Sequence, residues 1–207
     1  MHQLGLLPEL PEEMKKLEGD ETVNFTTYEL DFLKDLFTDP SSWASRSLML
    51  LDMKPDDSKT NAFGLSDFVL RASLPSSNGV TNAGSLATLA ELIRNNGKLG
   101  NTDVFSSRGP EVIAESLQLA ESYSDDLIMR TPIHFTRGGF ARFFAEDHSN
   151  SECYGWGGAG GSMVRLCHSK GVACAFTMNK LGLRMAMNDP RGNRLLATTL
   201  NCVPDTV

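Results

Sequence analysis

The sequence predicts an α+β fold in which helices pack on a short antiparallel sheet. Apolar residues recur at helical spacing between residues 82 and 120 and again after residue 189. Between these segments, residues 162–168 and 172–178 alternate as two strands around the turn sequence Ser169-Lys170-Gly171. The second strand carries large side chains on one face and small ones on the other, which is typical of a sheet covered by helices on both sides.

Two helices are expected before these strands and one after them. Asn82 is suited to cap the first helix and Gly97 to end it. The apolar face of that helix would consist of Leu86, Leu89, Ala90 and Ile93. The second helix would begin at Pro110, since proline is favoured in a first turn, and would carry Ile113, Leu117 and Ala120 on one face. Asp189 would cap the last helix, before Pro190 and a buried stripe of Leu196, Leu200 and Val203.

The rest of the chain divides at about residue 80. Residues 132–144 are rich in phenylalanine and are expected to form one strand with a bulge or bend at Gly138-Gly139. Residues 1–80 contain five prolines separated by polar clusters and are expected to pack irregularly on the surface. A chain of 207 residues suits one domain. The prediction is a single domain over residues 1–207, in which residues 81–207 supply the helices, three strands and a C-terminal helix.

The composition excludes several classes of protein. A formal net charge of −7 argues against binding to nucleic acid, which needs a basic face. No stretch approaches the roughly 18 apolar residues of a membrane span, and the first residues lack the features of a signal peptide, so a cytoplasmic location is the default expectation. Neither the four histidines nor the four cysteines show metal-ligand spacing, so no metal or organic cofactor is expected. Three of the cysteines lie in apolar patterns and are expected to be buried thiols.

The most informative segment is Tyr154-Gly155-Trp156-Gly157-Gly158-Ala159-Gly160-Gly161-Ser162. Dense glycine costs backbone entropy, and it usually marks the close approach of another backbone or of a ligand. Such a strand edge can present main-chain N–H groups to an oxyanion. A phosphate loop does not fit, because the run lacks GxxxxGK[ST] and leads into a strand rather than a helix. The alternative is a glycine-rich turn that only allows tight packing.

Three segments, in order, resemble the C-terminal region of serine β-lactamases, penicillin-binding proteins and related esterases. They are residues 75–87, then Gly155 to Ser162, and then Met178-Asn179-Lys180-Leu181-Gly182 followed by Asp189-Pro190-Arg191. The likeness is closest to the β-lactamase-related esterases, and it covers residues 75–200 well and residues 1–74 only by position. It implies the later part of the β-lactamase/transpeptidase-like fold, so the single domain would be a partial one.

The resemblance implies that Trp156, Gly157 and Gly158 are the third active-site motif of that family. The backbone N–H of Ala159 would be one of two oxyanion-hole donors, and the nucleophilic serine would supply the other. Trp156 stands where true β-lactamases have a lysine that binds a substrate carboxylate. Because an indole has one N–H donor and no charge, neutral esters are expected to be preferred over penicillins. Ordinary half-buried packing is the alternative for Trp156.

The first two motifs of that family are absent from this sequence. No serine has a lysine three residues later, so Ser-x-x-Lys, which supplies nucleophile and base, is missing. No tyrosine is followed by asparagine two residues on, and Ser76-Ser77-Asn78, which fits Ser-x-Asn formally, belongs to the first matched segment. An unactivated hydroxyl is a poor nucleophile at neutral pH. The simplest expectation is that the chain begins after both motifs.

Three functions stay open at this point. The first is a β-lactamase-related serine hydrolase fragment, inactive as this chain, whose parent would hydrolyse a small ester or amide through an acyl-enzyme. The second is a non-catalytic binding protein that keeps part of the fold, with a sheet edge left free to pair with another chain. The third is hydrolysis with an improvised nucleophile, Cys153. Asp147-His148-Ser149 is expected to be a polar loop, and His168 to be solvated or hydrogen-bonded.

Overall fold

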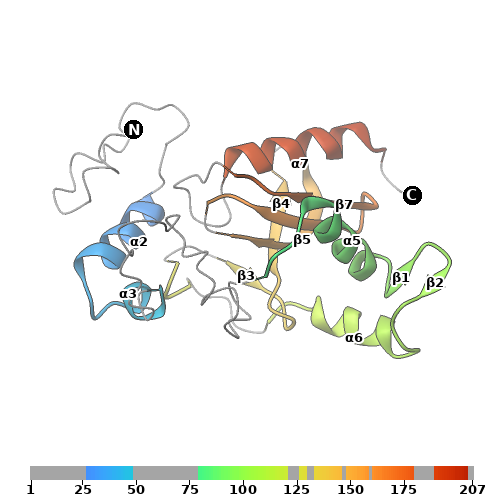
Figure 1. The fold of residues 1–207 in the computed structure, drawn as a ribbon, viewed down its shortest axis with the longest axis horizontal. Helices are drawn as coiled ribbons and strands as arrows, with labels where there is room; N and C mark the ends of the chain where they lie inside the picture. Colours follow the sequence, from blue (N-terminus) through green and yellow to red (C-terminus); the bar gives the residue numbers. More distant parts are fainter. Residues whose placement is uncertain are drawn as a thin grey trace.

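A computed structural model describes residues 27–48, 79–120, 126–129, 133–145, 148–158, 160–179 and 189–204. The helices in this part of the chain are α2 (Thr27–Thr38), α3 (Trp43–Leu48), α5 (Ala83–Arg94), α6 (Gly109–Ser116) and α7 (Pro190–Cys202). The strands are β1 (Lys98–Leu99), β2 (Thr102–Asp103), β3 (His134–Phe135), β4 (Ala141–Ala145), β5 (His148–Gly157), β6 (Met163–Cys167) and β7 (Val172–Phe176). Figure 1 shows their arrangement. None of the described helices is long and apolar enough to cross a bilayer.

Five of the strands form one antiparallel sheet in chain order, β3-β4-β5-β6-β7, and β1 pairs separately with β2. The predicted hairpin of β6 and β7 is confirmed, with Gly171 at a φ of +61° in its turn. The prediction of a single bent strand over residues 132–144 is wrong, because the Thr136 N–H donates to the Phe140 carbonyl and closes a hairpin. The predicted polar loop is also wrong for His148 and Ser149, which begin β5.

The predicted N-cap of α5 is confirmed, whereas the helix ends at Arg94 with Asn95 as its C-cap, two residues before the predicted stop at Gly97. The Asn82 side chain accepts a hydrogen bond of 2.9 Å from the Ser85 N–H. At the other end, the Gly97 N–H donates to the Leu92 carbonyl, with Gly97 at a φ of +88°. The buried face differs from the predicted one, since Leu92 is buried with Ala90 while Leu89 is 56% exposed. The face that packs is therefore displaced around the helix, which the spacing of apolar residues alone does not fix.

α6 begins at Gly109 with Pro110 in its first turn, close to the predicted start, and it buries Ile113. It ends at Ser116, earlier than the predicted apolar face requires. Leu117 is its C-cap residue, and Ala120 lies beyond the helix and is exposed.

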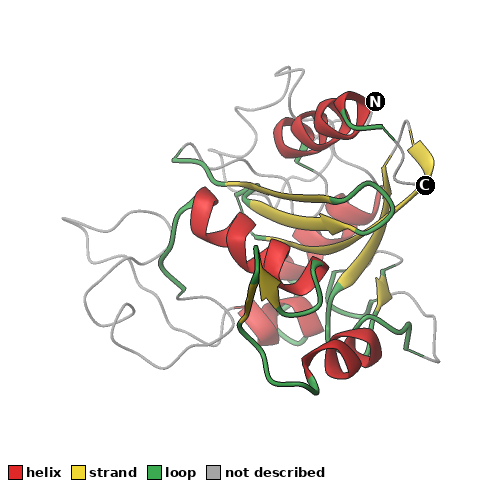
Figure 2. Ribbon diagram, turned by 90° about the vertical axis from the view of Figure 1, so that its right-hand side faces the viewer, coloured by secondary structure: helices red, strands yellow, loops and turns green. Residues whose placement is uncertain are grey.

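The five-stranded sheet is covered by a helix on each face, as the sequence predicts (Figure 2). α7 begins after Asp189, whose side chain accepts from the Arg191 N–H, and its Leu196 and Leu200 are buried. These two residues form a core cluster with Cys153, Met163, Cys167 and Val172 from the sheet. α5 packs against β6 and β7 from the other side. The predicted α+β fold, with helices on a short antiparallel sheet, is confirmed.

The expectation of irregular structure before residue 80 is wrong for two segments. α2 and α3 form a small helical pair in which Phe32 and Leu33 are buried. The Ser45 hydroxyl donates to the Leu36 carbonyl at 2.6 Å and so links the two helices. The spacing of Phe32, Leu33 and Leu36 is that of a helical face, but it is too short to dominate a proline-punctuated region.

A disulfide bond joins Cys153 of β5 to Cys167 of β6. Tyr154 pairs with Leu166 in the register of these strands, so the two cysteines lie directly opposite one another. Their Cα atoms are 4.2 Å apart, close to the spacing of a non-hydrogen-bonded antiparallel pair. The expectation of buried thiols is therefore wrong for Cys167. Cys202 is a free thiol but is exposed, so the expectation of burial is wrong for it. Cys174 is a free thiol and is partly buried.

The disulfide predicts the number of thiols that can be alkylated. Iodoacetamide added to denatured protein without reductant should modify two cysteines, Cys174 and Cys202, and prior reduction should raise this to four. Intact-mass spectrometry measures both numbers. A Cys174→Ser/Cys202→Ser variant is the control and should take no label without reductant. Four modified cysteines before reduction would show that the cross-strand pair is not oxidised.

Candidate functional site

The glycine-rich motif lies where β5 extends beyond β4. The register of β4 with β5 ends at the pair Ala141 and Gly155. Beyond that pair, Trp156 and Gly157 continue to pair with Val164 and Met163 of β6. At Trp156 and Gly157, the side of β5 that faces away from β6 therefore has no strand partner among the described residues. A strand edge of this kind can present backbone groups to a ligand.

A tight turn follows this edge. The Gly158 N–H donates to the Ser162 carbonyl at 2.7 Å, and the Gly161 N–H donates to the Gly158 carbonyl at 3.0 Å. The Gly158 N–H is consequently engaged within the turn and is not an oxyanion donor in this conformation. Ala159 lies outside the described residues, so its assignment as the donor stays a prediction.

The indole of Trp156 stacks on the ring of Phe135. The ring centroids are 5.6 Å apart and the planes are inclined by 29°. Trp156 remains 38% exposed, so the two rings form an apolar wall beside the motif that a ligand can reach. Sequence reasoning placed Phe135 only in a strand, because the contact with Trp156 depends on how the β3–β4 hairpin returns to the sheet.

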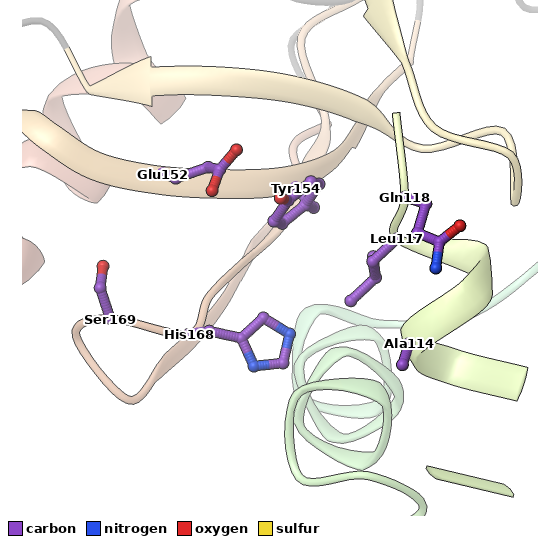
Figure 3. Close-up of a pocket in the computed structure, with 7 residues that line it drawn as sticks. All are labelled: Ala114, Leu117, Gln118, Glu152, Tyr154, His168 and Ser169. Atoms are coloured by element: carbon purple, nitrogen blue, oxygen red, sulfur yellow. The ribbon is translucent and has the colours of Figure 1, made fainter. Parts of the chain in front are cut away.

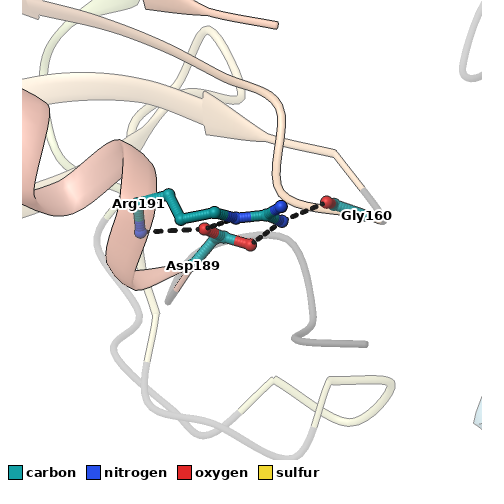
Figure 4. A network of polar contacts seen from close by, with 3 residues as sticks. All are labelled: Gly160, Asp189 and Arg191. Carbon is teal, nitrogen blue, oxygen red and sulfur yellow. Dashed lines mark hydrogen bonds and ion pairs between the residues drawn. The ribbon is translucent and has the colours of Figure 1, made fainter. Parts of the chain in front are cut away.

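The glycine turn is anchored to the start of α7 by Asp189 and Arg191 (Figure 4). Arg191 donates through Nε and Nη2 to the two carboxylate oxygens of Asp189, at 2.9 and 2.7 Å. The same Nη2 donates to the Gly160 carbonyl at 3.2 Å. Burial alone would raise the pKa of Asp189, but the side-chain and backbone hydrogen bonds from Arg191 outweigh it and hold that pKa below its usual value. The carboxylate is thus ionised at neutral pH and keeps its bonds to Arg191.

Arg165 of β6 lies directly beneath the motif and is 1% exposed. Its Nη1 donates to the Trp156 carbonyl at 2.5 Å and to the Val164 carbonyl at 2.9 Å. The guanidinium carbon lies 3.8 Å from the ring centre of Phe143 on β4. Burial lowers the pKa of Arg165 to about 10, so the side chain remains charged at neutral pH. The sequence contains a signal for this burial. Arg165 lies two residues from both Met163 and Cys167, so on a strand it shares their face of the sheet.

A cavity of about 470 Å³ lies near the motif, between the sheet and α6 (Figure 3). The residues lining it are Ala114, Leu117, Gln118, Glu152, Tyr154, His168 and Ser169. Tyr154 is two residues before Trp156, and none of the motif glycines lines the cavity. Burial, together with a hydrogen bond to Glu152 and the charge of that residue, raises the pKa of Tyr154 to about 12. The phenol is therefore neutral in the physiological range.

The cavity also contains the polar side chains of His168 and Ser169. Burial and the positive charge of Arg94 lower the pKa of His168, against the opposing charge of Glu152, which leaves the imidazole neutral at pH 7. The His168 ring packs edge-on against the Tyr154 ring, with 6.5 Å between the ring centroids. Figure 3 shows the Ser169 side chain directed away from the His168 ring. The imidazole, the phenol and the hydroxyl can each hydrogen-bond a ligand in the cavity.

Two other candidates from the sequence have definite outcomes. Cys153 is completely buried and disulfide-bonded, so the hypothesis that it serves as an improvised nucleophile is wrong. Within the part of the chain that the structure describes, no group of three or more His, Cys, Asp or Glu side chains is placed to hold a metal ion.

No protein-family profile and no curated protein sequence matches this chain. Several solved structures resemble it. One is a family VIII carboxylesterase, with 27% identity and a TM-score of 0.51 over 58% of this chain and 31% of that one. Another is a penicillin-binding protein homologue from Caulobacter crescentus, with 27% identity and a TM-score of 0.54 over 72% of this chain and 38% of that one. This chain has a β-lactamase-like fold. It spans less than two fifths of the length of either structure.

The β-lactamase-like assignment confirms the resemblance carried by the glycine-rich motif and its neighbouring segments. The fold is therefore shared with a carboxylesterase and with a penicillin-binding protein homologue.

The turn that follows the motif depends on glycine at position 161. Gly161 has a φ of +103°, and a Cβ atom there would overlap the carboxylate of Asp189. A Gly161→Ala variant should therefore lose about 3 kcal/mol or more of unfolding free energy, measured by urea denaturation. Gly100→Ala is the matched control, because Gly100 also has a positive φ of +56° but has open space around it, and should lose about 1 kcal/mol. Equal losses would contradict the close approach of Asp189 to the turn.

Proposed function

We propose that this chain carries the substrate-binding edge of a β-lactamase-related serine hydrolase and does not complete hydrolysis by itself. The observation that carries the proposal is the side of β5 at Trp156 and Gly157 that has no strand partner among the described residues, next to a turn held by Arg191. The proposal draws its reaction class from the two similar structures, one of them a carboxylesterase. No Ser-x-x-Lys occurs anywhere in the sequence, so nucleophile and base are not both supplied in that form.

The proposed roles follow from the chemistry of each group. The apolar wall of Trp156 and Phe135 would receive the acyl group of a neutral ester or amide. The N–H of Ala159 would stabilise the developing oxyanion. An oxyanion donor without nucleophile and base retains only a small part of the catalysis. The parent reaction would be ester or amide hydrolysis through an acyl-enzyme, with the attacking serine supplied from outside the residues present here.

The proposal predicts that the purified chain does not react with serine-hydrolase probes. A fluorophosphonate probe should label no residue, and the chain should not hydrolyse p-nitrophenyl butyrate above the rate of a heat-denatured sample. Intact-mass spectrometry and absorbance at the p-nitrophenolate band measure the two outcomes.

The decisive contrary result would be a labelled serine whose mutation to alanine abolishes both labelling and turnover. Ser162, in the motif, and Ser169, beside the cavity, are the two serines to replace first. Turnover that persists in both alanine variants, with no residue of the chain labelled, would point to a contaminating esterase rather than to this chain.

A non-catalytic interaction protein is the second candidate, and one observation favours it. β7 is the last strand of the five-stranded order, so its outer edge has no strand partner among the described residues. An open edge of this kind can pair with a strand of another chain. Its larger residues Val172, Cys174 and Phe176 pack against the core cluster beneath α7, so the edge itself offers mainly backbone groups.

If β7 pairs with another copy of this chain, the protein should self-associate, and a charge added to β7 should reduce that association. Sedimentation velocity between 10 and 300 μM should show a concentration-dependent dimer, and Ala173→Lys should shift the distribution to monomer. Thr88→Lys on the exposed side of α5 is a control with the same added charge and should leave the dimer unchanged. A single monomeric species at every concentration would remove this candidate.

A further inference from the structure

Arg165 is a buried cation without a carboxylate partner among the described residues. Its contacts are the two carbonyl oxygens of Trp156 and Val164 and the aromatic face of Phe143. Its nearest titratable neighbour is the thiol of Cys174, whose pKa burial raises, so that this group is neutral at pH 7. Burying a guanidinium group with no counter-ion is costly, because neither solvent nor an acid neutralises its charge. Such a charge is available to an anion that binds close by.

The register of the sheet explains how Arg165 reaches the motif. Arg165 lies opposite Gly155 on β5, and Gly155 has no side chain to stand in the way. The guanidinium therefore crosses β5, meets the Phe143 ring on β4, and bonds the Trp156 carbonyl at the point where β4 no longer accompanies β5. The charge thus lies against β5 next to Trp156, the first residue beyond the last β4 pair.

We propose that Arg165 supplies the positive charge of the candidate site from beneath the sheet, and that it makes the edge at residues 156–158 selective for a small aryl carboxylate over a neutral analogue of equal size. The proposal rests on the proposed function, in which the carboxylate stands in for the oxyanion of an ester under attack. Arg165 is a positioning residue, because it acts through the Trp156 carbonyl and through its field rather than by touching the ligand. The aryl group would lie on the wall of Trp156 and Phe135.

Other charges near the motif are paired and do not supply this field. Arg191 is bonded to Asp189, so that pair contributes little net charge. Arg142 is ion-paired with Glu152. Since Arg142 pairs with Tyr154 in the register, its side chain lies on the face of the sheet opposite to that of Arg165. A buried charge is also screened less by salt than these partly exposed groups.

The test compares benzoate with benzamide, which have the same shape but differ in charge. Ligand-observed and amide-detected NMR titrations of the full chain should give roughly tenfold tighter binding of benzoate, with shifts at the Trp156 indole and at the Gly157 and Gly158 amides. The preference should persist at 0.5 M NaCl, because a buried charge is weakly screened. Equal affinities, loss of the preference in salt, or shifts located away from the motif would each overturn the proposal.

Substitutions then assign the preference to Arg165. Arg165→Gln should remove the benzoate preference, whereas Arg165→Lys should keep most of it. Arg142→Gln is the matched control, because it removes a like charge from β4, two strands away from β6 and on the other face of the sheet, and it should leave the preference unchanged. If Arg165→Gln does not fold, the benzoate preference of the Arg165→Lys variant and its persistence in salt still test the proposal. An arginine with a merely structural role would give benzoate no advantage over benzamide. Serine labelling of the chain would overturn the proposed function and leave this selectivity standing, so the two failures can be distinguished.

Discussion

The pairing of β5 with β6 is the interaction on which the candidate site depends. At Tyr154 and Gly155 the strand β5 pairs with both β4 and β6, and beyond Gly155 its pairing among the described residues is with β6 alone. The buried disulfide between Cys153 and Cys167 ties the two strands just before this point. A slip of one residue would exchange the two faces of the sheet and move Trp156 to the core side. The open side of the motif is therefore a consequence of a fixed register and of the early end of β4.

Both ends of the glycine-rich motif are held by a guanidinium group bonded to a backbone carbonyl. Arg165 binds the Trp156 carbonyl, and Arg191 binds the Gly160 carbonyl. In a trans peptide the C=O and the following N–H point in opposite directions, so fixing a carbonyl also fixes the direction of the next amide. The Gly161 N–H indeed points back into the turn, where it donates to the Gly158 carbonyl. The arginines thereby orient the backbone that a ligand would meet, without occupying the edge themselves.

The sequence predicts the parts of this fold that local chemistry decides. Caps at Asn82 and Asp189 and the turn at Gly171 are set by a few neighbouring residues, and the structure confirms them. Contacts between distant segments were not predictable in the same way. The disulfide, the stacking of Phe135 on Trp156 and the hydrogen bonds of Arg165 all depend on strand register, which a single sequence leaves open. The single-domain organisation and the donor role of Ala159 stay predictions.

The energetics of the motif bear on whether its glycines serve binding or only tight packing. A turn that merely saves space needs small residues, whereas here a buried aspartate and a buried arginine also contact the same nine-residue motif. Each buried charge carries a desolvation cost that apolar packing would avoid. Arg165 offsets part of that cost only through carbonyl oxygens and an aromatic face, which leaves its positive field uncancelled next to an open strand edge. A purely structural turn gains nothing from such a field, so the arrangement favours a site that receives negative charge.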